Sequence, residues 1–269
     1  MSTEGGRTAG PRSVMGPEVV VNRFLWPAAA IAAGALALGV SVAVAGPTTQ
    51  QTVWHDNDNA WKIDNVGGGS TTFEVDQCNP TATPIGDGAL HLLVTDGSTQ
   101  AAQLRSTRYH RTYLRSILTL KYSTCARFNN GQQWPYIILN VDYDGDNNTD
   151  DLLFFEPAYQ DPAEGSASCP DQGEEMFFQW QRWDARNGCW WSLEGTAGAT
   201  PGSGVKPLSV IIAAEPNAAI VNPNGNHGGV RLVQGFGDPV PHDGWVDAFE
   251  ISDRNANSNI TYNFEEGPN

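Results

Sequence analysis

Four aspartates of one short loop have the type and spacing of ligands for a hard cation. Asp142, Asp144 and Asp146 occupy alternate positions, and Asp150 follows them in the same loop. Ca²⁺ binds about six to eight oxygen ligands, and carboxylates this close repel one another when no cation is present. We therefore predict that these four aspartates hold a structural Ca²⁺. The alternative is a solvated acidic turn. A transition metal is disfavoured because no His or Cys stands nearby.

The segments that flank the loop, Tyr136–Val141 and Asp151–Glu156, are short, β-branched or aromatic, and therefore typical of strands. They do not fit a helix–loop–helix EF-hand. That motif also requires a glycine where Asn147 stands and a glutamate where Leu153 stands. The spacing resembles instead the D-x-D-G-D-x-x-x-D calcium loops of FG-GAP and related β-repeat proteins. This resemblance implies the ligand set Asp142, Asp144, Asp146 and Asp150. Asn147 replaces a glycine there, and asparagine tolerates the left-handed conformation.

A second group of residues could bind a sugar. It comprises Trp180, Trp183, Trp190, Trp191 and Arg182. Flat aromatic rings stack on the apolar C–H faces of pyranose rings, so carbohydrate is the ligand class that this group predicts. Side chains alternate along a strand, so the two tryptophans of each pair, Trp180 with Trp183 and Trp190 with Trp191, point to opposite faces. One member of each pair is therefore expected in the core. Arg182 has a second interpretation, as part of the polar end of a hairpin.

The sequence contains no motif of a known catalytic constellation. It lacks the paired-acid strand motif of retaining glycosidases and the G-x-S-x-G motif of serine hydrolases. The best lyase-like cluster consists of His110, Tyr109, Tyr113 and Arg108. We therefore predict non-catalytic carbohydrate binding. A polysaccharide lyase or glycosidase on the same fold is the alternative, and a structural or adhesive role in the cell envelope is a third interpretation.

The elements that must position these residues are short strands. Apolar or alternating runs recur between Gly, Pro, Asn and Asp residues, and no helical periodicity is convincing, which predicts an all-β, antiparallel sandwich. The predicted strands are Thr72–Val75, Ala89–Thr95, Ala102–Ser106, Ser116–Ser123, Tyr136–Val141, Asp151–Glu156, Glu174–Trp183, Cys189–Ser192, Leu208–Ala213, Val230–Gln234, Trp245–Ile251 and Ile260–Phe264.

The order of several motifs carries a resemblance over residues 52–265. These motifs are Gly86–Leu92, Leu118–Thr124, Phe154–Pro157, Trp180–Ala185, Cys189–Ser192, Trp245–Phe249 and Thr261–Phe264. In this order they resemble a group of uncharacterised secreted bacterial domains with a jelly-roll, concanavalin A-like or laminin-G-like sandwich. The resemblance implies the fold but transfers no activity, because sandwiches host many functions.

The first part of the chain is predicted to precede the fold. Arginines are followed by an apolar run, Phe24–Val44, which ends in the small residues of an A-x-A cleavage site. We predict a signal peptide over residues 1–45, with an uncleaved membrane anchor as the alternative. Residues 46–51 are expected to form a linker and residues 52–269 the sandwich.

Charge and cysteine content indicate the compartment and the classes of partner. The net charge of −15 disfavours nucleic acid and anionic lipid surfaces. All four cysteines follow the predicted cleavage site, and an extracellular location permits disulfides. Three pairings are possible. We predict the pairing Cys78–Cys125 and Cys169–Cys189.

Overall fold

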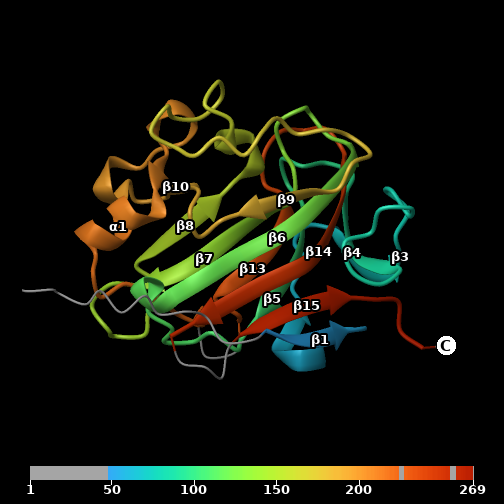
Figure 1. The fold of residues 1–269 in the computed structure, drawn as a ribbon, viewed down its shortest axis with the longest axis horizontal. Helices are drawn as coiled ribbons and strands as arrows, with labels where there is room; N and C mark the ends of the chain where they lie inside the picture. The colour runs from blue at the N-terminus through green and yellow to red at the C-terminus, as the bar shows by residue number, and fades with distance from the viewer. Residues whose placement is uncertain (1–47, 224–226, 255–258, 269) are drawn as a thin grey trace, which may run out of the picture. The chain divides into compact units, whose positions relative to one another are not determined.

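The computed structural model describes residues 48–223, 227–254 and 259–268, and these residues form an all-β sandwich of two sheets (Figure 1). This confirms the predicted fold class. In the described residues the one α-helix is α1, Leu208–Ala214. No helix of this part of the chain is long and apolar enough to cross a bilayer. The signal peptide predicted over residues 1–45 lies outside the described residues.

The first sheet is built around β14, which is long enough to pair with three other strands. Its strands are β1 (Thr49–Val53), β15 (Ile260–Phe264), β14 (His242–Asp253), β4 (Gly88–Val94) and β3 (Ser70–Val75), with β6 (Ile117–Phe128) beside β14 and β9 (Gln181–Asp184) beside β6. All of these pairs are antiparallel except β1 with β15, which is parallel. The predicted antiparallel pattern is therefore confirmed, with one exception at the sheet edge.

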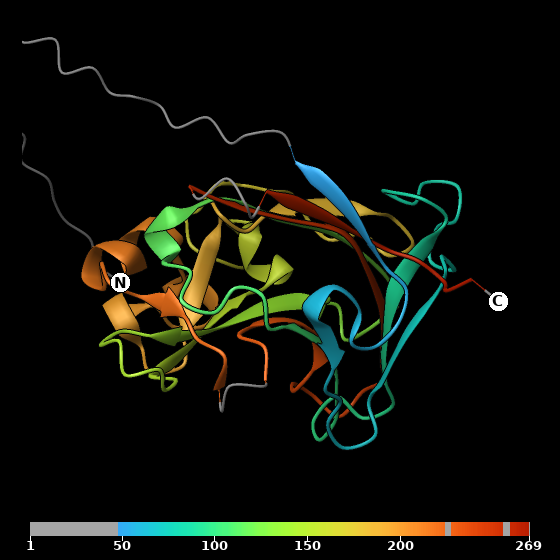
Figure 2. The same ribbon diagram turned by 90° about the horizontal axis from the view of Figure 1, so that it is seen from below.

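The second sheet contains both strands of the acidic hairpin. Its order is β11 (Lys206–Pro207), β10 (Cys189–Ser192), β8 (Asp151–Phe155), β7 (Tyr136–Asp142), β13 (Val230–Gly235), β5 (Ala101–Ser106) and β2 (Trp61–Ile63), and β12 (Ala219–Ile220) also pairs with β7. Every pair is antiparallel. Figure 2 shows this sheet and the first sheet as two layers.

The core lies between the sheets because alternate residues of each strand point inward. Leu104, Leu232, Ile137 and Phe155 of the second sheet belong to the same buried cluster as Leu90, Leu120, Tyr122 and Val246 of the first. Tyr122 meets Phe155 edge-on, with ring centroids 5.9 Å apart. Because these residues face inward, their neighbours along the second sheet face outward.

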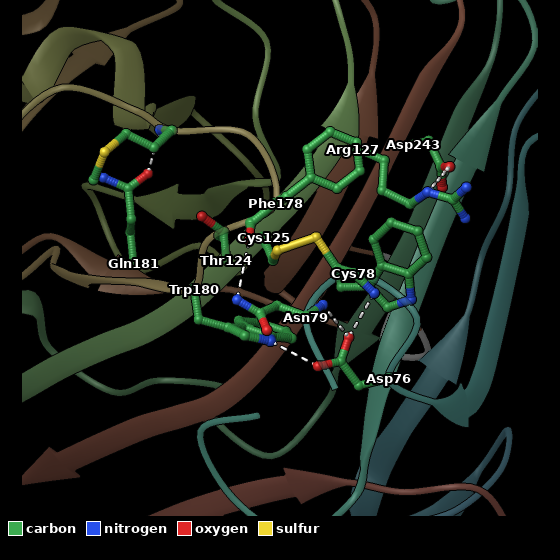
Figure 3. Close-up of a disulfide and its surroundings, with 12 residues drawn as sticks. Asp76, Cys78, Asn79, Thr124, Cys125, Arg127, Phe178, Trp180, Gln181 and Asp243 are labelled. Carbon is green, nitrogen blue, oxygen red and sulfur yellow. Dashed lines mark hydrogen bonds and ion pairs between the residues drawn. A yellow bond between two sulfur atoms is a disulfide. The ribbon is translucent and has the colours of Figure 1, made fainter. Parts of the chain in front are cut away.

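Two disulfides join Cys78 to Cys125 and Cys169 to Cys189, which is the predicted pairing. The first disulfide joins β6, which contains Cys125, to the loop after β3. The second joins β10, which contains Cys189, to the segment between β8 and β9. Figure 3 shows the first disulfide beside Asp76, Asn79 and Trp180.

Three predictions about local structure are wrong or incomplete. The run Leu208–Ala213 was predicted as a strand but forms α1, in which Leu208 and Ile211 are buried and Val210 is exposed. A three-residue period of burial fits a helix, and short apolar runs do not distinguish the two structures. The predicted strand Glu174–Trp183 becomes a strand only from Gln181 onward. The linker predicted over residues 46–51 overlaps β1, whose polar sequence gives no strand signal.

Candidate functional site

The acidic loop between β7 and β8 is folded around Asp142, a buried residue at the end of β7. Its Oδ1 accepts hydrogen bonds from the N–H groups of Asp144 (3.1 Å) and Gly145 (2.6 Å), and its Oδ2 from Asn147 (2.8 Å). Asn147 has a φ of 70°, the left-handed conformation expected from its position. Carboxylate oxygens of Asp142, Asp144 and Asp146 lie within 4.8 Å of one another. Three hard oxygen donors at this spacing fit Ca²⁺.

Asp150, the fourth predicted ligand, does not belong to this group. Its Oδ2 accepts a hydrogen bond from the N–H of Tyr143, 2.6 Å away. The next residue, Asp151, is buried and joins the hairpin to the segment after β10. It accepts hydrogen bonds from the hydroxyls of Tyr143 (2.8 Å), Ser192 (2.5 Å) and Thr196 (2.9 Å). The structure therefore brings three of the four predicted ligands together and gives the fifth aspartate of this region a structural role.

The four tryptophans predicted to bind a ligand do not form one site. Trp183 and Trp190 are fully buried, and their indole N–H groups donate to Thr124 Oγ1 and the carbonyl of Ala185. Their prediction as ligand-binding residues is wrong. The expectation that one tryptophan of each pair lies in the core is confirmed. Strand alternation explains this for Trp190 and Trp191, which are both in β10, whereas Trp180 precedes β9 and is placed by the loop before it.

Trp180 and Arg182 lie on the first sheet, away from Trp191. Trp180 donates its indole N–H to Asp76 Oδ2 at 2.8 Å, beside the Cys78–Cys125 disulfide (Figure 3). Arg182 forms a 2.6 Å ion pair with Glu250. Both residues line a depression of about 440 Å³. The polar groups of Trp180 and Arg182 are therefore each engaged by a carboxylate within the protein.

Trp191 is half-buried on the outer face of the second sheet. Its ring is stacked on Phe154, with centroids 3.8 Å apart and an angle of 3° between the planes. Its indole N–H donates to Glu156 Oε1 at 2.6 Å. These residues border a groove of about 340 Å³, whose lining also includes Gln133, Tyr136, Ile138, Leu152, Leu193, Arg231 and Phe236.

The register of the second sheet explains how residues far apart in sequence meet in this groove. Trp191 pairs with Phe154, Phe154 with Ile138, Ile138 with Arg231, and Arg231 with Arg105. Paired residues lie on the same face, so they form one row across five strands. One end of the row is aromatic and the other is cationic. The sequence analysis identified Trp191 but missed Glu156, Tyr136 and Arg231. Each of these three residues lies in a predicted strand, at a position that alternates with core residues and therefore faces outward.

Burial changes the ionisation of the groove. Desolvation raises the pKa of Glu156 from 4.5 to about 7, and the indole N–H of Trp191 partly opposes this shift. Desolvation and the nearby Arg105 lower the pKa of Arg231 to about 10. Burial also raises the pKa of Tyr136, whose hydroxyl donates to the carbonyl of Gly235 at 2.9 Å. At neutral pH the groove therefore contains a charged guanidinium, a neutral phenol and a carboxyl group near its titration midpoint.

The candidate lyase-like cluster contains His110, Tyr109, Tyr113 and Arg108. The Tyr109 side chain is buried, and its hydroxyl lies 2.9 Å from that of Tyr262 in the core. His110 Nδ1 accepts a hydrogen bond from the backbone N–H of Asn222 at 3.1 Å. Arg108 donates to Gln51 on β1. Arg108 also acts on the hydroxyl of Tyr262 beside Tyr109, whereas His110 is engaged with Asn222, so His110 does not share a partner with these two residues.

No protein-family model matches the chain, and no curated protein matches its sequence. Among solved structures, a β-1,2-glucanase from Parabacteroides distasonis is similar over 71% of this chain and 23% of its own, with 11% identity and a TM-score of 0.37. A structure described as domains CD of another protein is similar over 74% of this chain and 65% of its own, with 11% identity and a TM-score of 0.36. The chain thus spans less than two thirds of either structure.

Proposed function

We propose that this protein is an exported, calcium-stabilised β-sandwich that binds carbohydrate without catalysis on the outer face of its second sheet. The observation that carries the proposal is the stacked pair of Trp191 and Phe154, which borders a groove containing Tyr136, Glu156 and Arg231. Aromatic faces supply apolar contact, and a few placed polar groups orient a ligand. The two disulfides support a location outside the cell.

The dimensions of the row fit an extended ligand. Neighbouring strands are about 4.8 Å apart, so the distance from Trp191 to Arg231, three strands away, is about 14 Å. A single sugar ring is shorter than this distance. The groove therefore favours an oligosaccharide that stacks on the aromatic end and reaches polar groups at the other.

The lining residues favour binding over hydrolysis. A glycosidase of the usual type uses two carboxyl groups on either side of the scissile bond. Among the described residues that border the groove of Trp191, Glu156 is the one carboxyl group. Binding by shape and stacking needs no second carboxyl group, so the proposed role is recognition.

Replacing Trp191 by alanine is expected to lower the affinity for an oligosaccharide at least about tenfold, because stacking contact is lost. A glycan array first identifies a ligand, and titration calorimetry then compares the wild type with Trp191→Ala. The matched control is Trp54→Ala, since Trp54 is 42% exposed and does not border the groove. Equal losses in the two variants would contradict the proposed site. Release of reducing ends from the ligand would contradict a non-catalytic role.

Calcium is expected to stabilise the domain through Asp142, Asp144 and Asp146. At a Ca²⁺ concentration about 100 times Kd, the free energy of unfolding should rise by about 2.7 kcal/mol relative to the same protein in EDTA. Asp144→Asn should abolish most of this increase, because it removes one of the three clustered carboxylates. Asp150→Asn is the control within the same loop, since Asp150 lies outside the cluster, and it should retain the response. Chemical denaturation with and without Ca²⁺ measures the response of the wild type and of each variant. An equal free energy of unfolding of the wild type in Ca²⁺ and in EDTA would show that the loop needs no ion.

A further inference from the structure

We infer that the groove recognises an anionic saccharide, and that Arg231, supported by Arg105, binds its carboxylate or sulfate group. The inference rests on the proposed function, because it names the ligand class of the same groove. It is carried by the cationic end of the row that crosses the second sheet. This end has more positive charge than the protein itself neutralises.

Arg231 is a half-buried cation, and the carboxylate of Asp64 acts on it without forming a direct ion pair with it. Its Nε donates to Asn140 Oδ1 at 2.7 Å, and in the described part of the chain its guanidinium forms no ion pair. A charge that has lost part of its hydration and gained no directly paired opposite charge is unfavourable. An anionic ligand at this position would supply the missing partner while the guanidinium stays charged at neutral pH.

Arg105 adds a second guanidinium directly opposite Arg231 on the neighbouring strand. Arg105 is nearly buried, and its Nη1 donates to Asp64 at 2.6 Å and its Nε to the carbonyl of Gly228 at 3.0 Å. Its Nη2 is buried and has no hydrogen-bond partner among the described residues. Asp64 is ion-paired to Arg105 and also acts electrostatically on Arg231, so one carboxylate faces two guanidinium groups and one positive charge remains in excess. Arg231 borders the groove and its planar guanidinium is suited to the oxygens of a carboxylate or sulfate, whereas Arg105 lies behind it and adds positive charge without bordering the groove.

The net negative charge of the protein disfavours non-specific binding of acidic polymers. With a net charge of −15 the chain repels polyanions at long range. An acidic saccharide would therefore not bind this face by non-specific electrostatic adsorption. Binding of an acidic polymer would depend on short-range contacts at Arg231. Charge repulsion elsewhere would then exclude polyanions that do not fit the groove.

The spacing of the row defines the arrangement of the ligand. Arg231 and Phe154 are separated by β7, which places them two strand spacings, or about 10 Å, apart. Ile138 lies between them and offers an apolar floor. The ligand therefore presents an acidic group at Arg231 and a stackable ring face at Phe154 and Trp191, on different sugar units of one chain.

The test compares matched acidic and neutral oligosaccharides by titration calorimetry. Two pairs of probes are compared. The first pair is an oligogalacturonate and its fully methyl-esterified form, and the second is a heparin-derived hexasaccharide and its desulfated form. The wild type should bind at least one acidic probe about tenfold or more tightly than its neutral counterpart. The two pairs distinguish a carboxylate from a sulfate.

Arg231→Gln should abolish the preference for the acidic probe over its neutral counterpart, while Arg231→Lys should retain part of this preference. The control is Arg182→Gln, since Arg182 is ion-paired to Glu250 on the other sheet. If Arg231→Gln does not fold, competition by free galacturonate against galactose on the wild type decides the same question. Binding of neutral probes with no acidic preference would overturn the inference and leave the proposed function intact. Binding of neither probe, and of no glycan on the array, would overturn both.

Discussion

Replacing Cys78 and Cys125 by serine is expected to lower the free energy of unfolding by about 4 kcal/mol. The two cysteines are 47 positions apart, and the segment between them contains β4 and β5, one strand from each sheet. Without the bond, the unfolded chain gains the freedom of a long loop. The Cys169–Cys189 bond spans 20 positions, and its loss should lower the free energy by about 3 kcal/mol.

The native contacts around the first disulfide should survive its removal. Asp76 Oδ1 accepts hydrogen bonds from the N–H groups of Cys78 (2.8 Å) and Asn79 (3.2 Å), and its Oδ2 accepts the indole N–H of Trp180 (Figure 3). These bonds fix the loop after β3 independently of sulfur. Removal of this disulfide should therefore lower the free energy of unfolding and leave the folded structure unchanged.

Guanidinium denaturation of both double-serine variants, each against wild type, measures these losses. Oligosaccharide binding provides a second readout, because Cys189 belongs to β10, which carries Trp191, whereas Cys125 lies on the other sheet. The Cys169→Ser, Cys189→Ser variant should bind more weakly than the Cys78→Ser, Cys125→Ser variant although it is more stable. A smaller stability loss for the 47-residue loop would contradict the loop-closure argument.

Elements with a strong local pattern could be predicted from the sequence. The apolar runs on both sides of the acidic loop form β7 and β8, and Ile260–Phe264 forms β15 with the predicted bounds. In contrast, β1 contains Thr49, Gln50, Gln51 and Thr52, which carry no hydrophobic alternation. This strand forms because its backbone pairs with β15, and a partner distant in sequence leaves no local signal.

The candidate site could be predicted only in part, for a related reason. Alternation along one strand correctly implied that Trp190 and Trp191 face opposite ways. It could not decide which of them faces the core, because that depends on how β10 pairs with β8. Likewise, Glu156, Trp191 and Arg231 come from separate segments. Their meeting in one groove depends on cross-strand register, which a sequence pattern does not determine.

Glu156→Gln is expected to stabilise the protein at pH 8 and to have little effect at pH 5. The pKa of Glu156 is raised from 4.5 to about 7 because the carboxyl group is desolvated. The folded state therefore holds this proton more tightly than the unfolded state. The resulting stability is fully present below pH 4.5 and is lost as pH rises through about 7. At about 1.4 kcal/mol per pH unit, the loss approaches about 3 kcal/mol by pH 8.

Glutamine avoids this loss because it cannot ionise and its Oε1 can still accept the Trp191 N–H. Denaturation at several pH values between 5 and 8 measures the difference, with Glu266→Gln as an exposed control. The pH dependence should weaken without vanishing, since burial also raises the pKa of Asp247 and Glu175 to about 7. Equal stability of Glu156→Gln and wild type at pH 8 would show that the ionised carboxylate is well solvated in the folded protein.

The same titration should govern ligand binding in the groove. When Glu156 ionises above pH 7, a negative charge appears beside Trp191 in the groove that also holds Arg231. An acidic saccharide should then bind more weakly as pH rises from 6 to 8, whereas its neutral counterpart should change little. In Glu156→Gln the acidic saccharide should bind equally at both pH values. A persistent pH dependence in that variant would assign the effect to another group and separate the ionisation of Glu156 from anion recognition by Arg231.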